Sequence, residues 1–180
     1  MRDAMYSMQY DSPLGRLLLT CREDGLTGIR FGEAGPEPTD HPVLRQTAAW
    51  LDSYFRGDNP VADIPLAPEG TPFQKQVWRL LLTIPYGETR SYGEIARELA
   101  AVSRKRKMSA QAVGQAVGKN PISILIPCHR VVGAKGQLTG YAGGMERKIQ
   151  LLQLEGRQIE NNIVLQTRRK EYAFWGNSSH

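Results

Sequence analysis

The stretch that decides the interpretation of this 180-residue chain is Ile124-Leu125-Ile126-Pro127-Cys128-His129-Arg130-Val131-Val132. Its cysteine lies between apolar residues on one side and His129 and Arg130 on the other. In such a setting a base can take the thiol proton and nearby cations can favour the thiolate, which is the form that attacks carbon. The pattern therefore indicates a nucleophile at Cys128. The residues alone also allow a buried structural cysteine beside a satisfied histidine, which is the commoner arrangement for such a pair.

A metal site is the poorer interpretation of the same residues. Zinc in proteins takes about four ligands at recognisable spacing. The remaining candidates, Cys21, His41 and His180, form no such pattern around Cys128 and His129. We therefore expect no metal and no cofactor.

Upstream of this stretch the pattern is helical. Thr71-Pro72 combines a favoured N-cap with proline at the first helical position, and apolar residues then follow on one face. Ser91 with Glu94 forms a capping box for the next helix, and Ser109 to Val117 reads as another, ending at Gly118. Two short helices joined by a connector and followed by Asn120-Pro121 indicate a helix-turn-helix.

The first part of the chain has a different pattern. Short apolar runs at residues 5–10, 16–21 and 26–31 alternate with turn signals, which predicts a small antiparallel sheet. Residues 42–56 carry apolar side chains at helical spacing. The proline-containing loop at residues 65–70 is the expected domain boundary.

Composition limits the class of protein. The hydrophobic fraction is 41% and the charged fraction 23%, which is ordinary for a globular protein, and no apolar run approaches the roughly 20 residues of a membrane span. Two cysteines cannot build a disulfide framework, and no secretory signal is apparent, so we expect a cytoplasmic protein. The net charge of +5 permits DNA binding without requiring it.

The motif Pro127-Cys128-His129-Arg130-Val131 resembles the active-site motif of the O6-alkylguanine-DNA alkyltransferases. The resemblance runs in order through further segments, Thr71-Pro72-Phe73-Gln74, Pro85-Tyr86-Gly87-Glu88-Thr89, Ser91-Tyr92-Gly93-Glu94-Ile95-Ala96, Ala112-Val113-Gly114, Asn120-Pro121, Tyr141-Ala142-Gly143-Gly144 and Leu154-Glu155-Gly156. It implies an α/β N-terminal domain with a small ribonuclease-H-like sheet (1–68), a mainly helical C-terminal domain with a helix-turn-helix and the active site (69–158), and a tail (159–180).

The resemblance also implies a mechanism. Cys128 attacks the alkyl carbon and guanine O6 is the leaving atom, while a water molecule relays the thiol proton to His129, which Glu155 orients. Asn120 braces the turn between the recognition helix and the active site. The product is a stable thioether, so each molecule reacts once.

The target guanine must be rotated out of the duplex to reach the sulfur at the floor of a cleft. By resemblance, Tyr92 promotes this flipping and hydrogen-bonds the base. The carbonyls of Cys128 and Val131 and the N–H of Ala142 contact the guanine, and Tyr141 lines the wall. Further DNA contacts are expected at Ser91, Ala112, Gly114 and Arg130.

Two features depart from the family pattern. Gln111 stands where the recognition helix normally inserts an arginine into the space that the base has left, so we expect weaker phosphate attraction but retained flipping. The connector between the two helices is longer and contains Arg104-Lys105-Arg106-Lys107. These four cations either contact DNA phosphates or form a solvated loop.

The resemblance implies a monomer whose partner is double-stranded DNA containing O6-alkylguanine, and O4-alkylthymine is a further candidate lesion. One alternative is an alkyltransferase-like protein that binds the lesion without chemistry, but that class lacks the reactive cysteine. A second is a cysteine hydrolase that uses Cys128 and His129. Adjacent residues rarely have the geometry of a direct Cys-His dyad, and such an enzyme would have no use for the helix-turn-helix.

Overall fold

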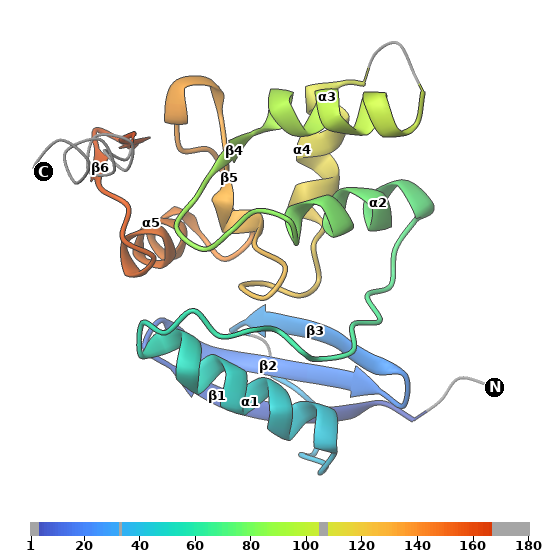
Figure 1. The fold of residues 1–180 in the computed structure, drawn as a ribbon. Coiled ribbons are helices and arrows are strands. Elements are labelled where there is room, and N and C mark those ends of the chain that lie inside the picture. The colour runs from blue at the N-terminus through green and yellow to red at the C-terminus, as the bar shows by residue number, and fades with distance from the viewer. Residues whose placement is uncertain (1–3, 33, 105–107, 167–180) are drawn as a thin grey trace, which may run out of the picture.

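The computed structural model describes residues 4–32, 34–104 and 108–166 of the chain. In Figure 1 a sheet with one helix lies below a group of helices that carries the second half of the chain. The α/β and helical halves expected from the sequence are both present.

The sheet has three antiparallel strands in the order β1 (Tyr6–Ser12), β2 (Gly15–Arg22) and β3 (Gly25–Phe31). Helix α1 (Pro42–Phe55) packs across one face of it (Figure 1). Leu17 and Leu19 of β2 and Leu44 and Leu51 of α1 are fully buried between the two layers. Leu17 and Leu19 lie two positions apart in the strand, so their side chains point to the same face of the sheet.

The free edge of β3 joins the two halves of the molecule. The N–H of Leu26 donates to the carbonyl of Pro65, and the N–H of Ile29 donates to the carbonyl of Pro121, at 2.8 and 3.0 Å. Parallel bridges pair Leu26 with Leu66 and Ile29 with Ile122. Because an unpaired strand edge exposes backbone groups that need partners, this pairing both protects β3 and anchors the segment that leads to Cys128.

The helical half begins with α2 (Pro72–Leu81), which is followed by α3 (Tyr92–Val102) and α4 (Ala110–Gly118). The capping box at Ser91 and Glu94 is present, and Thr71 with Gln74 forms a second one. Helices α3 and α4 pack against each other as the expected helix-turn-helix, and the indole N–H of Trp78 in α2 donates to the carbonyl of Ala116 at 2.9 Å. Helix α4 extends through Gly118 and is capped at Lys119, one residue beyond the expected end.

The segment after α4 builds the centre of the molecule. Cys128 opens a short 3-10 helix, η1 (Cys128–Arg130). Strand β5 (Val131–Val132) follows and pairs in parallel with β4 (Arg90–Ser91), which places the start of α3 beside the reactive segment (Figure 1).

The chain then passes through a second 3-10 helix, η2 (Ala134–Gly136), to α5 (Met145–Leu154) and a hairpin of β6 (Ile159–Glu160) and β7 (Ile163–Val164). The sequence analysis did not place α5. Its signal is weak because one of its three buried residues is a lysine, Lys148, beside Leu151 and Leu152. One buried cluster nonetheless runs continuously from β2 and α1 through α2 to Cys128 and Leu151.

Candidate active site

Cys128 is deeply buried at the junction of the two halves. Only 3% of the residue is exposed, and its N–H donates to the carbonyl of Ile126 at 2.8 Å. Burial raises the pKa of the thiol, while a hydrogen bond from Asn120 and the positive charge of Lys148 act in the opposite direction. The resting sulfur is therefore a protonated thiol that needs a base, and the expected open cleft above it is closed in this conformation.

Asn120 braces the turn that leads to Cys128. Its amide N–H donates to the carbonyl of Ile126 at 2.8 Å, and its amide oxygen accepts from the N–H of Ile122 at 2.9 Å. The bridged loop contains Ile124 at a φ of 71°, a conformation that is costly for a β-branched residue. Asn120 thus holds a strained turn and also hydrogen-bonds the thiol.

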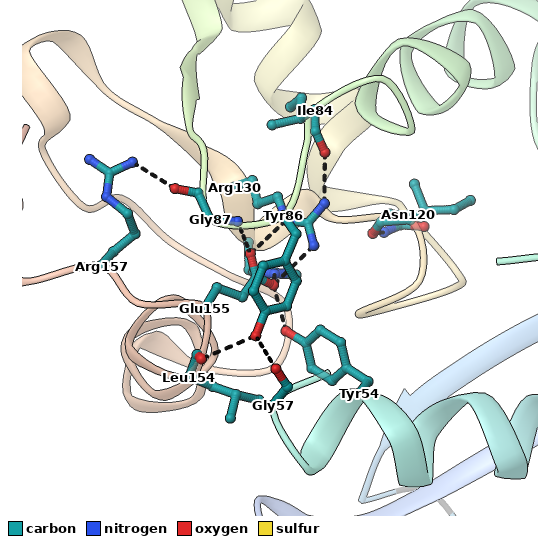
Figure 2. Close-up of polar contacts among 12 residues, drawn as sticks. Tyr54, Gly57, Ile84, Tyr86, Gly87, Asn120, Arg130, Leu154, Glu155 and Arg157 are labelled. Atoms are coloured by element: carbon teal, nitrogen blue, oxygen red, sulfur yellow. Dashed lines mark hydrogen bonds and ion pairs between the residues drawn. The ribbon is translucent and has the colours of Figure 1, made fainter. Parts of the chain in front are cut away.

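Glu155, at the C-cap of α5, is the hub of a buried polar network (Figure 2). Its Oε2 accepts from the Tyr54 hydroxyl at 2.5 Å and lies 2.7 Å from His129 Nε2. Its Oε1 accepts from the Gly87 N–H at 3.1 Å, where a φ of 78° suits glycine. Although burial alone would raise the pKa of Glu155, His129 and Arg130 hold it well below its usual range, so the group is a carboxylate.

The carboxylate determines how His129 carries its proton. Since a carboxylate can only accept hydrogen bonds, Nε2 of the fully buried imidazole must donate to it. Burial lowers the pKa of His129 although Glu155 opposes this, so the ring rests neutral and Nδ1 has the free lone pair. Nδ1 has no hydrogen-bond partner among the described residues, which leaves it available as a proton acceptor.

Arg130 has a different role from the expected DNA contact. Its Nε donates to Oε1 of Glu155 at 2.7 Å, its Nη2 donates to Oε2 at 3.1 Å, and its Nη1 donates to the carbonyl of Ile84 at 2.7 Å. Only 11% of its side chain is exposed. The guanidinium of Arg130 is hydrogen-bonded to Glu155 and Ile84 and neutralises the buried carboxylate. We therefore assign Arg130 to the network and not to the DNA interface.

Lys148 is the cation that the sequence analysis missed. It has no exposed surface, and its Nζ donates to the carbonyls of Val131 and Thr139 at 2.7 and 3.2 Å. Burial lowers its pKa to about 8, while the neighbouring Cys128 acts in the opposite direction. The cation that favours the thiolate is therefore Lys148 of α5, and not His129 or Arg130.

The expected pocket residues surround the thiol. The hydroxyls of Tyr92 and Thr139 lie 2.8 Å apart, and burial together with Cys128 raises the pKa of Tyr141. Val131 is buried, with its carbonyl directed to Lys148, whereas Ala142 is exposed on the loop before α5. The structure thus brings Tyr92, Tyr141 and Val131 together around Cys128.

The expected DNA-binding residues lie along the start of α3 and on α4. Ser91 caps α3, Gln111 is exposed on α4, and Gly114 lies beside the Tyr92 ring, where an added Cβ would make an ordinary van der Waals contact at 3.7 Å. Ala112 is partly exposed in the same helix. Gly114 of α4 and Ser91 at the start of α3 thus lie on either side of Tyr92.

Only part of the basic connector can be placed. Arg104 is exposed and has a positive φ of 57°, whereas Lys105, Arg106 and Lys107 lie outside the described residues, as does the tail from residue 167. A groove of about 680 Å³ runs between the start of α3 and residues 132–136 and is lined by Tyr92 and the exposed cations Arg97 and Lys135. The sequence analysis did not single out these two cations.

The part of the chain that the structure describes contains neither a cluster of candidate metal ligands nor a helix that could span a membrane. No group of three or more histidine, cysteine, aspartate or glutamate side chains there could hold a metal ion. No helix in the same part is long and apolar enough to cross a membrane.

A helix-turn-helix near a buried cysteine that is followed in the chain by a neutral histidine defines a class, DNA-binding proteins that react through a thiol. Two family models match the chain. The 6-O-methylguanine DNA methyltransferase ribonuclease-like domain covers residues 5–68, and the DNA-binding domain of the same family covers residues 72–157. The chain therefore belongs to the 6-O-methylguanine DNA methyltransferase family.

Individual relatives agree with this. The chain is 46% identical to a methylated-DNA–protein-cysteine methyltransferase of Methanosarcina acetivorans over 84% of its own length and 99% of the relative. It resembles the crystal structure of Mycobacterium tuberculosis O6-methylguanine methyltransferase with a TM-score of 0.73 and 44% identity, covering 84% of this chain and 93% of that one. A structure of the Mycobacterium tuberculosis protein in complex with DNA matches with a TM-score of 0.72 and 46% identity, over 84% and 91% of the two chains.

Proposed function

We propose that this protein repairs DNA by moving an alkyl group from O6 of a damaged guanine onto the sulfur of Cys128. The observation that carries the proposal is the buried thiol next to a histidine that is held neutral, with one ring nitrogen free to accept a proton. Family membership supports the same reaction, because the relatives are named for it.

The reaction is a displacement at the alkyl carbon. The sulfur forms a bond to this carbon while the bond from the carbon to O6 breaks, and the electron pair of the broken bond stays on the guanine. The thiol proton passes through a water molecule to Nδ1 of His129. Glu155 stabilises the resulting imidazolium, Asn120 and Lys148 stabilise the thiolate, and Arg130 balances the charge of Glu155.

The burial of Cys128 has a consequence for substrate access. A thiol that is 3% exposed cannot meet an everted purine unless a neighbouring segment moves. We propose that the loop between β5 and α5, residues 133–144, shifts outward when the base enters, because Tyr141 of this loop lies against the sulfur. Tyr92 then contacts the base, together with the backbone of Val131 and Ala142.

The DNA surface follows from the helix-turn-helix. We propose that α4 enters the minor groove of double-stranded DNA and that Gln111 fills the space left by the flipped guanine. Ser91, Ala112 and Gly114 lie along this surface, and Arg97 and Lys135 add charges that can face phosphates. The mycobacterial relative solved with DNA supports this choice of partner.

The domain boundaries, the oligomeric state and the cellular location are proposed as follows. We propose domains at residues 1–68 and 69–158, a tail at 159–180, and action as a cytoplasmic monomer. Cys21 and Cys128 are both free thiols, which fits a reducing compartment.

Intact-mass spectrometry after mixing the protein with an O6-methylguanine duplex tests the proposal. We expect a gain of one methyl group per molecule, located on Cys128 by peptide mapping, and no second turnover. The Cys128→Ser variant is the control and should bind the same duplex without gaining mass. A lesion-binding protein without chemistry would show binding and no gain in either protein, and a hydrolase would turn over repeatedly; either result would refute the proposal.

A further inference from the structure

The carboxylate of Glu155, which orients His129, accepts a hydrogen bond from a residue of the N-terminal half of the molecule. Tyr54 belongs to α1 of the N-terminal half and is 101 positions away from Glu155, yet its hydroxyl donates to Oε2 at 2.5 Å (Figure 2). The contact is shielded from water, since Tyr54 is 1% exposed and the Glu155 side chain has no exposed surface. A hydrogen bond to a buried carboxylate is worth more than one at the surface.

The oxygen that accepts from Tyr54 is the one that His129 uses. Oε2 receives the Tyr54 hydroxyl and His129 Nε2 and, at 3.1 Å, Nη2 of Arg130. Each donor withdraws negative charge from this oxygen, so each one weakens the pull of the carboxylate on the imidazole proton. The N-terminal half therefore acts on the atom that sets the state of His129.

We propose that Tyr54 is a positioning residue of the alkyl-transfer site: through Oε2 of Glu155, its hydroxyl keeps His129 neutral with Nδ1 free to take the Cys128 proton. This inference rests on the proposed function. The hydroxyl touches neither the sulfur nor the base, so Tyr54 acts only through Glu155.

Further charged and titratable groups surround Glu155 and His129. They are Tyr86 after α2, Arg130 of η1 and Lys148 of α5. The hydroxyl of Tyr86 donates to the carbonyl of Leu154 at 3.2 Å and lies 3.5 Å from the carbonyl of Gly57 (Figure 2), so it bonds no carboxylate oxygen. Tyr86 is therefore a matched control from the same cluster.

The packing of Tyr54 permits removal of the hydroxyl alone. Its ring stacks on Trp50 at 5.3 Å and meets Phe55 and Tyr86 edge-on at 5.3 and 6.2 Å. Phenylalanine keeps all of these ring contacts. Tyr54→Phe thus loses a single donor to Oε2.

The test is the titration of the His129 ring, followed by ¹⁵N NMR in protein labelled on its three histidines. Without the Tyr54 donor, Oε2 carries more negative charge and favours the imidazolium, so the titration of His129 in Tyr54→Phe should move to higher pH. The rate of methyl transfer should fall about threefold to tenfold on the acid side of the profile and stay within about twofold of wild type at alkaline pH. Tyr86→Phe should leave the titration of His129 in place.

Replacement of Tyr54 by 4-aminophenylalanine keeps a donor at this position and should move the titration back toward that of wild type. It also provides a second variant should Tyr54→Phe fail to fold. An unchanged titration in Tyr54→Phe, or an equal shift in Tyr86→Phe, would overturn the inference, while methyl transfer by the wild-type protein would still support the proposed function. Absence of transfer by the wild-type protein would instead refute the proposed function.

Discussion

The ammonium group of Lys148 lies 2.7 Å from the carbonyl oxygen of Val131, three residues beyond the reactive Cys128. Burying the charge of a lysine with no exposed surface costs free energy unless hydrogen bonds or an opposite charge compensate it. Here the charge lies close enough to the thiol to lower the pKa of Cys128, against the effect of burial. The position of α5 is therefore part of the chemistry as well as of the fold.

Lys148→Met should slow methyl transfer about tenfold at pH 7, because the thiolate loses its cation. The pKa of Lys148 is lowered to about 8, so its charge is present below this pH and is lost above it. The difference in rate between wild type and variant should therefore shrink between pH 7 and pH 9. Single-turnover assays across this range check the prediction. Lys75→Met, at an exposed position of α2, is the control and should match wild type.

The stability of wild type should rise with pH between about pH 8 and pH 10. The folded state releases the Lys148 proton at lower pH than the unfolded chain, so the unfolded state holds more protons between about pH 8 and pH 10. The penalty for burying the charge is thus relieved as pH rises. Urea unfolding should show this rise in wild type and not in Lys148→Met. An equal rise of the free energy of unfolding with pH in both proteins would contradict the prediction.

Glu155→Gln should destabilise the fold at pH 7 by about 3 kcal/mol or more, because Arg130 is left as a buried, unpaired cation. Since folding lowers the pKa of Glu155, its carboxylate contributes stability above the unfolded pKa of about 4.3 and loses it as pH falls further. Wild type should therefore lose stability toward pH 3 more steeply than the variant. Urea unfolding at both pH values checks this. Glu146→Gln, at an exposed position of α5, should change stability by less than about 0.5 kcal/mol.

Asn120→Ala should cost about 1–3 kcal/mol of stability and slow transfer, because the turn with the positive φ at Ile124 loses both of its side-chain bonds. Asn120→Asp separates the role of Asn120 in the turn from its hydrogen bond to the Cys128 sulfur. It keeps an acceptor for the Ile122 N–H but loses the donors to Ile126 and to the sulfur, and it adds a negative charge near the thiolate. We expect it to be the slower variant of the two. Equal transfer rates for the two variants would argue that Asn120 acts on the turn alone.

Gln111 is exposed on α4, so its substitution should affect DNA and leave the fold unchanged. Gln111→Arg should bind duplex more tightly at low salt because it adds a permanent charge, and Gln111→Ala should repair more slowly because nothing fills the space beside the orphaned cytosine. Repair rates and the salt dependence of binding check both statements. Equal rates for all three proteins would remove Gln111 from the mechanism.

Much of the local structure could be predicted from the residues. The capping box of Ser91 and Glu94 and the short apolar run at residues 16–21 depend on neighbours in the chain, and the structure contains both the capping box and a strand over this run. The motif around Cys128 and its spacing to Asn120 also lie within one short segment. Helix α5 was missed because its buried Lys148 interrupts the apolar pattern.

What the sequence by itself determined is therefore the order of the elements up to α4 and their caps, because these depend on interactions between residues close in the chain. The choice of Cys128 as nucleophile came from the resemblance of its motif to a known family. Only the tertiary structure decided that Arg130 turns inward, that Lys148 supplies the cation and that Tyr54 reaches Glu155. The physical reason is that charges and hydrogen bonds in a buried site act over a few ångströms of space. The residues that meet there come from α1, η1 and α5, and no local pattern records their contact.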